Sequence, residues 1–349
     1  MSGFPIAITG TGMVTGVGLN APATCAAIRC ALDNFQETRF MDNGGEWLMG
    51  CEVPLEQPWR GRTKLIKMAA AAINECLANN LIDPKATPLL LCLSEHERKG
   101  RVIDDDNQFF LDLQAELGME FHEKSRVIAR GHVAVAVALK HARQLLQELS
   151  FKHVLIAATD SLLVAQTLAH YEEHERLLTS QNSNGFIPGE AGAALVVEAV
   201  HAKREHQLIC HGLGFGVEKA HVDSEEPLRA DGLTAAIKES LGDAGCEMGD
   251  LDFRITDISG DQYYFKEASL ALLRLLRKRK EEFDIWHPAD CIGEVGVVMG
   301  PIMIAVLKAA CEKDYSKGNH IVAHLGNDDG KRSSMIFMWQ EVGGGNYGE

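Results

Sequence analysis

Short apolar stretches alternate along this chain with longer stretches in which apolar residues recur every three or four positions. The short stretches predict strands at residues 5–12, 87–94, 152–161, 191–199 and 253–261, and a pair of strands within 320–339. The longer stretches predict helices at residues 21–32, 63–78, 133–149, 233–244, 268–279 and 296–312. Apolar strands between helices indicate stacked α/β layers with a buried sheet.

Composition and charge narrow the class of protein. The chain has 349 residues, of which 46% are hydrophobic and 24% charged, as in a globular protein with a large core. No apolar run reaches the roughly 18–20 residues of a membrane span, and the first residues do not resemble a signal peptide, so we expect a cytoplasmic protein without a membrane span. The formal net charge of −15 argues against nucleic acid as a partner, because phosphate binding needs clustered Lys and Arg.

The nine cysteines stand singly along the chain. None lies in a CxxC pair or at metal-ligand spacing from a histidine. We therefore expect reduced, buried thiols and no metal site.

The first strand is followed by four closely spaced glycines, Gly10, Gly12, Gly16 and Gly18. The last three have the spacing of the nucleotide-binding turn of short-chain dehydrogenases. Such an enzyme also needs a Tyr with Lys four positions later, and none of the five tyrosines has one. Glu37 is the acidic residue at the distance of a ribose ligand, but the segment before it is not strand-like. We therefore expect no cofactor.

Three segments carry a resemblance to a known family. Residues 5–20 (PIAITGTGMVTGVGLN) resemble the opening strand and turn of the β-ketoacyl synthases. Residues 176–198 contain Asn-Gly-Phe-x-Pro-Gly-Glu before an apolar strand, which closely resembles a signature of that family. Residues 289–310 (ADCIGEVGVVMGPIMIAVLKAA) resemble the late segment that bears its last catalytic histidine. The likeness runs in the family's order through residues 4–339.

The resemblance implies the thiolase-like fold, an α/β fold of two similar βαβαβαββ halves in five α-β-α-β-α layers. The halves would be residues 1–200 and 201–342, with a flexible Gly-rich tail at 343–349. It also implies a homodimer formed through the strand at Lys152–Asp160. The opening glycines would then form the first strand-to-helix turn, where close packing and positive φ favour glycine.

The same resemblance implies a catalytic cysteine at a helix start and two histidines that stabilise an oxyanion. Matching the turn RVIARGHV at Gly131 puts Ile128 at the position of the cysteine, and a slip by one residue gives Ala129. The histidine positions fall on Ser259 and on Glu294, whose carboxylate would repel an oxyanion. We therefore expect that all three catalytic residue types are missing.

Other polar residues would remain near the old cleft. The candidates are Ser125, Phe186, Asp261, Asp290, Cys291, His324, Asp328 and Asp329. One interpretation is a repurposed metal or hydrolase site; the other is a polar remnant with capped helix starts. The signature residues would instead maintain the fold, and these are Gly185, Pro188, Gly189 and Glu190.

Two classes of function stay open at this point. One is an accessory or adaptor subunit that has lost condensation, comparable to a chain-length factor beside an active synthase or to an adaptor in a secretion or assembly apparatus. Such a subunit would bind a protein partner, and an acyl or acyl-carrier ligand, as a homodimer or in a heterodimer. The alternative is a divergent acyltransferase or decarboxylase that acts on acyl thioesters with other residues.

Overall fold

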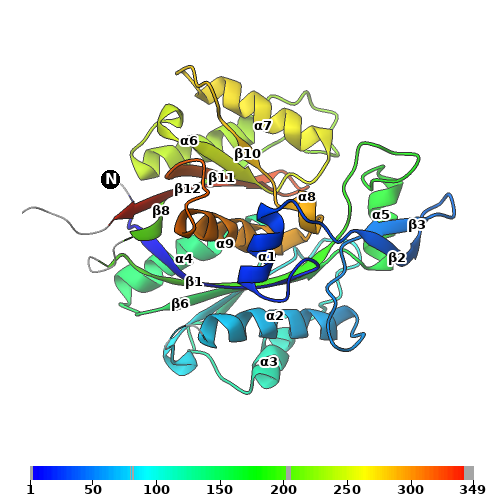
Figure 1. Ribbon diagram of the computed structural model, residues 1–349, viewed down its shortest axis with the longest axis horizontal. Coiled ribbons are helices and arrows are strands. Elements are labelled where there is room, and N and C mark those ends of the chain that lie inside the picture. Colours follow the sequence, from blue (N-terminus) through cyan, green and yellow to red (C-terminus); the bar gives the residue numbers. More distant parts are fainter. Residues whose placement is uncertain (1–2, 79, 81, 202–205, 342–349) are drawn as a thin grey trace, which may run out of the picture.

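The main sheet repeats one strand pattern twice. The computed structural model describes residues 3–78, 80, 82–201 and 206–341. Within them, ten strands form one sheet in the order β10-β9-β11-β12-β8-β1-β7-β6-β4-β5 (Figure 1). A short antiparallel contact between β1 and β8 joins the two sets of five strands.

The two sets have the same topology. The first contains β1 (Ile6–Thr15), β4 (Leu89–Leu93), β5 (Arg126–Ala129), β6 (Val154–Ser161) and β7 (Glu190–Ala199). The second contains β8 (His206–Val217), β9 (Phe253–Thr256), β10 (Ile285–Trp286), β11 (His320–Gly326) and β12 (Lys331–Glu341). In each set the last strand, β7 or β12, is antiparallel to both neighbours. Three strands of each set pair in parallel, and these are β4, β5 and β6 in the first and β9, β10 and β11 in the second.

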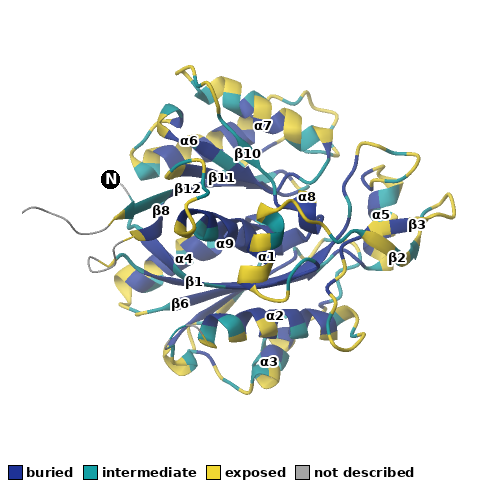
Figure 2. Ribbon diagram, viewed as in Figure 1, coloured by how far each residue is buried: buried dark blue, intermediate teal, exposed yellow. Residues whose placement is uncertain are grey.

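Helices complete five layers. The outer layers are α2 (Gly61–Ala78) with α3 (Asp106–Leu117), and α6 (Asp231–Ala244) with α7 (Gln262–Leu275). The middle layer, between the two halves of the sheet, contains α4 (Ala134–Glu148), α9 (Met299–Glu312) and α1 (Ala21–Arg29) (Figure 1). Most of α9 is buried (Figure 2), as expected for a helix that is apolar on all sides. The predicted thiolase-like layer order is confirmed.

Shorter elements lie between these layers. A hairpin of β2 (Gln36–Met41) and β3 (Trp47–Gly50) stands apart from the main sheet beside α5 (Ala165–Glu173) (Figure 1). One further short helix is α8 (Ala289–Ile292). Single 3₁₀ turns are η1 (Pro84–Ala86), η2 (Gly131–Val133), η3 (Met248–Asp250) and η4 (Gly296–Val298).

The opening glycines serve packing more than turning. Gly10 and Gly12 lie inside β1, so the prediction that they form a turn is wrong. A Cβ on Gly12 would lie 2.1 Å from the carbonyl oxygen of Ala72 in α2, which shows that the strand and the helix are in close contact. Gly16 and Gly18 follow the strand, and none of the four has a positive φ. The predicted close packing of these glycines is therefore confirmed, and the predicted positive φ is wrong.

Helix α7 differs from its predicted range of 268–279. It begins six residues earlier, at Gln262, because the rings of Tyr263 and Tyr264 are held inside the protein by hydrogen bonds to Ala220 O and Asp328. It ends at Leu275, so the basic residues at 277–280 lie beyond it. The predicted flexible tail at 343–349 lies outside the described residues.

Strand β6 lies inside the sheet, between β7 and β4. Its first seven residues are buried, and both of its edges are paired. Another subunit therefore cannot extend the sheet along Lys152–Asp160, and the expected dimer contact through this strand is wrong. The two edges of the described sheet are β5 and the short β10.

Candidate functional site

Two equivalent helix starts meet in the middle layer. Gly131 opens η2 before α4, and Gly296 opens η4 before α9, with φ values of +60° and +58°. A Cβ on Gly131 would lie 2.5 Å from a carboxylate oxygen of Glu95, and one on Gly296 would lie 2.1 Å from Asp160. Only glycine combines this left-handed conformation with this close approach.

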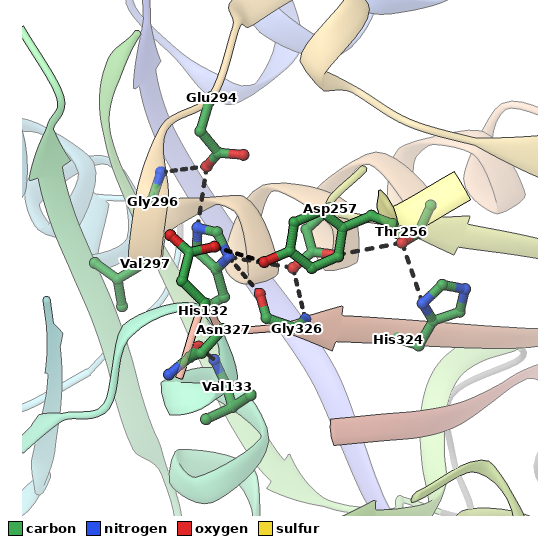
Figure 3. A network of polar contacts seen from close by, with 12 residues as sticks. His132, Val133, Thr256, Asp257, Glu294, Gly296, Val297, His324, Gly326 and Asn327 are labelled. Carbon is green, nitrogen blue, oxygen red and sulfur yellow. Dashed lines mark hydrogen bonds and ion pairs between the residues drawn. The ribbon is translucent and has the colours of Figure 1, made fainter. Parts of the chain in front are cut away.

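His132 follows the first of these glycines and lies between two carboxylates (Figure 3). Its Nε2 is 3.0 Å from Glu294 Oε1, and its Nδ1 is 3.3 Å from Asp257 Oδ2. Nδ1 also lies 2.9 Å from the carbonyl oxygen of Gly326. Since both ring nitrogens face only acceptors, both carry a proton and the ring is an imidazolium. Burial alone would lower the pKa of His132, but Glu294 and Asp257 raise the pKa well above 6.5.

The backbone fixes both of these carboxylates. Glu294 Oε1 accepts a hydrogen bond of 2.8 Å from Gly296 N, and Asp257 Oδ2 accepts one of 2.8 Å from Gly326 N. Thr256 Oγ1 donates to the other oxygen of Asp257 at 3.2 Å. His132 is therefore held by groups that are themselves held in place.

A second cluster centres on Arg176. Its guanidinium donates to Asp261 Oδ2 from Nε (3.0 Å) and Nη2 (2.7 Å), and to Asp328 Oδ1 at 3.2 Å. Asp328 also accepts hydrogen bonds from the hydroxyls of Tyr171 (3.2 Å) and Tyr264 (2.5 Å). Burial would raise the pKa of Asp328, but Arg176 and the Tyr264 hydrogen bond lower it to about 2.

A third pair lies beside Gly296. Arg98 donates to both oxygens of Asp160, at 2.6 and 2.5 Å, and Val297 N donates to Asp160 Oδ2 at 3.1 Å. The guanidinium of Arg98 and the buried carboxylate of Asp160 therefore neutralise each other at this helix start.

The cavity between the His132 and Arg176 clusters is small. Its volume is about 20 Å³, which is room for one water molecule. The lining residues are His132, Tyr171, Arg176, Phe186, Asp257, Ser259, Tyr264, Glu294, Gly326 and Asp328. No cysteine is among these described lining residues, and the imidazolium of His132 has no lone pair to take a proton from Ser259.

The structure brings together part of the predicted cleft. Four predicted residues line the cavity, and these are Phe186, Ser259, Glu294 and Asp328. Asp261 contacts it through Arg176. His324 lies behind it, where its Nδ1 contacts Thr256 Oγ1 at 3.2 Å and burial lowers its pKa to about 4.

Other predicted residues lie elsewhere. Ser125 accepts a hydrogen bond from Leu89 N and donates to His122 O at the far end of the strands. Asp329 is paired with Lys331 in the β11–β12 turn.

Asp290 and Cys291 lie in α8 and line a different, larger cavity. Ile128 lies within β5, paired with Cys92 of β4, before the Gly131 turn.

The signature residues make contacts that support a structural role. Gly189 N donates to Glu294 O at 2.7 Å, and a Cβ on Gly185 would lie 2.5 Å from the backbone of Leu177. Pro188 forms a backbone bridge beside Glu294. Glu190 accepts hydrogen bonds from Val53 N and Ser161 Oγ and pairs with Lys64.

Sequence reasoning missed most of the charged lining, which is His132, Arg176 and Asp257. His132 directly follows the glycine of the helix-start turn, so its position carried a signal. Asp257 was placed inside the predicted strand at 253–261, but it directly follows β9, which ends at Thr256. Arg176 stands at the start of the signature segment, but its distance in sequence from Asp261 and Asp328 gave no indication of their contact.

Comparison with solved structures identifies the architecture. A type II polyketide synthase acyl-carrier protein in complex with its ketosynthase bound to the hexaketide (AntDE:AntF) matches with a TM-score of 0.79 and 15% identity, over 97% of this chain and 100% of the matched one. The chain has the thiolase-like fold of the ketosynthases. At this identity the likeness shows the fold alone.

Two further ketosynthase structures match over nearly the whole chain. The ishigamide ketosynthase/chain length factor matches with a TM-score of 0.69 and 17% identity, over 98% of this chain and 100% of the other. The ketosynthase ApeO in complex with its chain length factor ApeC from Xenorhabdus doucetiae matches with a TM-score of 0.71 and 12% identity, over 95% of this chain and 97% of the other. No protein-family model and no curated protein matches the sequence.

Two further properties concern the described part of the chain only. No helix there is both long and apolar enough to span a membrane. No group of three or more His, Cys, Asp or Glu side chains there is arranged to hold a metal ion.

Proposed function

We propose that this chain is a ketosynthase-fold subunit that binds a protein partner and does not itself form an acyl-enzyme. The observation that carries the proposal is the position of His132 as a double donor between Glu294 and Asp257. A group that holds both of its protons for two carboxylates is neither a general base nor a free donor to an oxyanion.

The size of the cavity supports the same function. An acyl chain needs a pocket of several hundred cubic ångströms, as small-molecule sites generally do. The cavity at the two helix starts has about 20 Å³. Phe186 and the hydrogen-bonded side chains of Arg176 and Asp328 line this cavity and leave no room in it for an acyl group.

The buried thiols give no alternative nucleophile. Seven of the nine cysteines are buried. Burial raises the pKa of Cys25 and Cys291 to about 11 and that of Cys51 and Cys210 to about 12, so these groups are neutral thiols at pH 7.

The protein partner is suggested by the matched structures and by the sheet edge. Those structures are of ketosynthases with an acyl-carrier protein or with a chain length factor. In this chain β5 is the longer free edge of the described sheet, and its outward backbone groups are available to a partner strand. We place the partner contact there instead of at β6.

The proposal is tested by incubating the protein with acyl- and malonyl-phosphopantetheine thioesters, followed by intact mass and by thioester-dependent CO₂ release. We expect no adduct and no CO₂, while an active ketosynthase treated in parallel gives both. An adduct or CO₂ release would overturn the proposal and support a divergent acyltransferase or decarboxylase. Affinity purification of the wild-type protein from the native host is expected to recover the partner. The variant Val127→Pro, which blocks the β5 edge, is expected not to recover it.

A further inference from the structure

A second, much larger cavity lies away from the two helix starts. It has a volume of about 450 Å³, within the range of small-molecule sites. It is formed by the end of α1, the segment from β10 to α8, the middle of α9 and the turn after α9. These elements come from both halves of the chain, and pockets between such units are a common place for ligands.

The walls of this cavity are mostly apolar. Val306, Pro288 and Cys291 are buried and form its inner part, and the half-buried Ile28 and Trp286 form its sides. Trp286 is held in place by the ring of Phe253, with ring centroids 4.6 Å apart. The cavity is therefore a preformed pocket with mainly apolar walls.

The mouth carries one cation that is not paired. Arg29 lies over the ring of Tyr315, with its guanidinium carbon 4.4 Å from the ring centroid. Among the described residues it has no ion pair with a carboxylate. The other titratable groups of the lining, His287 and Asp290, are paired with each other through a contact of 2.8 Å. A guanidinium stacked on a ring keeps its N–H edge free for a carboxylate.

From this arrangement we infer that the cavity binds a small monocarboxylate with an apolar body. The apolar part packs against Ile28, Trp286 and Val306, and the carboxylate accepts hydrogen bonds from Arg29 at the mouth. A dianion such as a phosphate monoester is disfavoured, because the single free cation, Arg29, matches a single negative charge. This site does not depend on the proposed function, since it shares no lining residue with the cavity at His132.

Cys291 in this cavity is a wall group and not a nucleophile. Burial raises the pKa of its thiol to about 11. His287, the histidine of the lining, is paired with Asp290 and does not accept the thiol proton. Binding without covalent chemistry is therefore expected.

The test is calorimetric titration of the full-length protein with octanoate and, separately, with 1-octanol, which has the same apolar body without the charge. We expect saturable binding of octanoate. Arg29→Gln is expected to weaken octanoate about tenfold or more and to leave 1-octanol unchanged. Ile28→Phe, which reduces the hollow, is expected to weaken both.

Arg39→Gln is the matched control, because Arg39 is also an exposed arginine over an aromatic ring, 4.7 Å from the centroid of Phe40, and lies outside the cavity. It is expected to leave both affinities unchanged. The inference is overturned if octanoate shows no saturable binding at millimolar concentration, if Arg29→Gln binds it as well as the wild type, or if Arg39→Gln weakens it equally.

Discussion

The ion pair between His132 and Glu294 gives a prediction whose size and pH dependence follow from the geometry. Their side chains are 21% and 7% exposed, and Nε2 and Oε1 are 3.0 Å apart. Two unit charges at about 4 Å attract by ~4 kcal/mol at an effective dielectric constant of about 20. Desolvation offsets part of this attraction, which leaves about 2 kcal/mol for a charge-assisted hydrogen bond. We expect Glu294→Gln to lose about that much free energy of unfolding at pH 6.

The loss should depend on pH in one direction. Because Glu294 raises the folded-state pKa of His132 above its ordinary value, the pair stabilises the protein fully below about pH 6.5. This contribution falls as the pH rises through the folded-state pKa, by at most ~1.4 kcal/mol for each pH unit. The difference between wild type and Glu294→Gln should therefore shrink toward alkaline pH.

Guanidinium denaturation followed by circular dichroism from pH 6 to pH 9 measures this difference. Glu312→Gln is the control, because Glu312 forms an ion pair with Lys308 one turn away at the surface of α9, and such pairs contribute about 0.3–0.5 kcal/mol. The reasoning is refuted if the deficit of Glu294→Gln is constant with pH, grows with pH, or equals that of the control. NMR of the histidine rings should show His132 as an imidazolium at pH 7.

Three other changes test the packing, the buried charges and the thiols. Gly12→Ala should destabilise the protein by several kcal/mol in thermal unfolding, because a Cβ would meet the backbone of α2. Gly242→Ala, at an open position within α6, should stabilise it by roughly 0.5–1 kcal/mol. Equal effects of the two substitutions would contradict the close contact between β1 and α2. Arg176→Ala should cost about 3–5 kcal/mol in denaturant unfolding, because it leaves two carboxylates without their cation; a cost below 1 kcal/mol would show that water replaces it. Iodoacetamide should modify Cys30, which is exposed, before any buried cysteine, as read by peptide mass; early modification of a buried thiol would contradict the assigned burial.

The layers and most helices and strands could be predicted from the sequence, because buried positions recur at regular intervals along each element. The apolar run at residues 87–94 is present as β4, since a strand covered on both faces admits few polar side chains. The small-residue helix at 133–149 is present as α4, with its buried residues on one face. Helix α7 was displaced because its first turn contains Tyr263 and Tyr264, whose anchoring depends on distant partners.

The site was predicted only in part, because its contacts join residues far apart in the chain. Glu294 and Asp328 were identified through their positions in the family motifs, and both line the cavity. Asp290 and Cys291 stand only a few positions before Glu294, but they lie in the short helix α8 and line another cavity. Nothing in the local sequence indicates that His132 pairs with Glu294, more than 160 residues away.

The position of β1 has a consequence for how the chain is made. This strand is synthesised before the other strands of the described sheet, yet it lies in the middle of the sheet, between β7 and β8. Its partners in β7 follow more than 170 residues later, which is roughly 10–35 s of synthesis at about 5–20 residues each second. During that interval its apolar side chains have no sheet to enter, so folding of the first half cannot be completed until the segment around residue 200 is free. A chain truncated before that segment is expected to collect as aggregate or on chaperones.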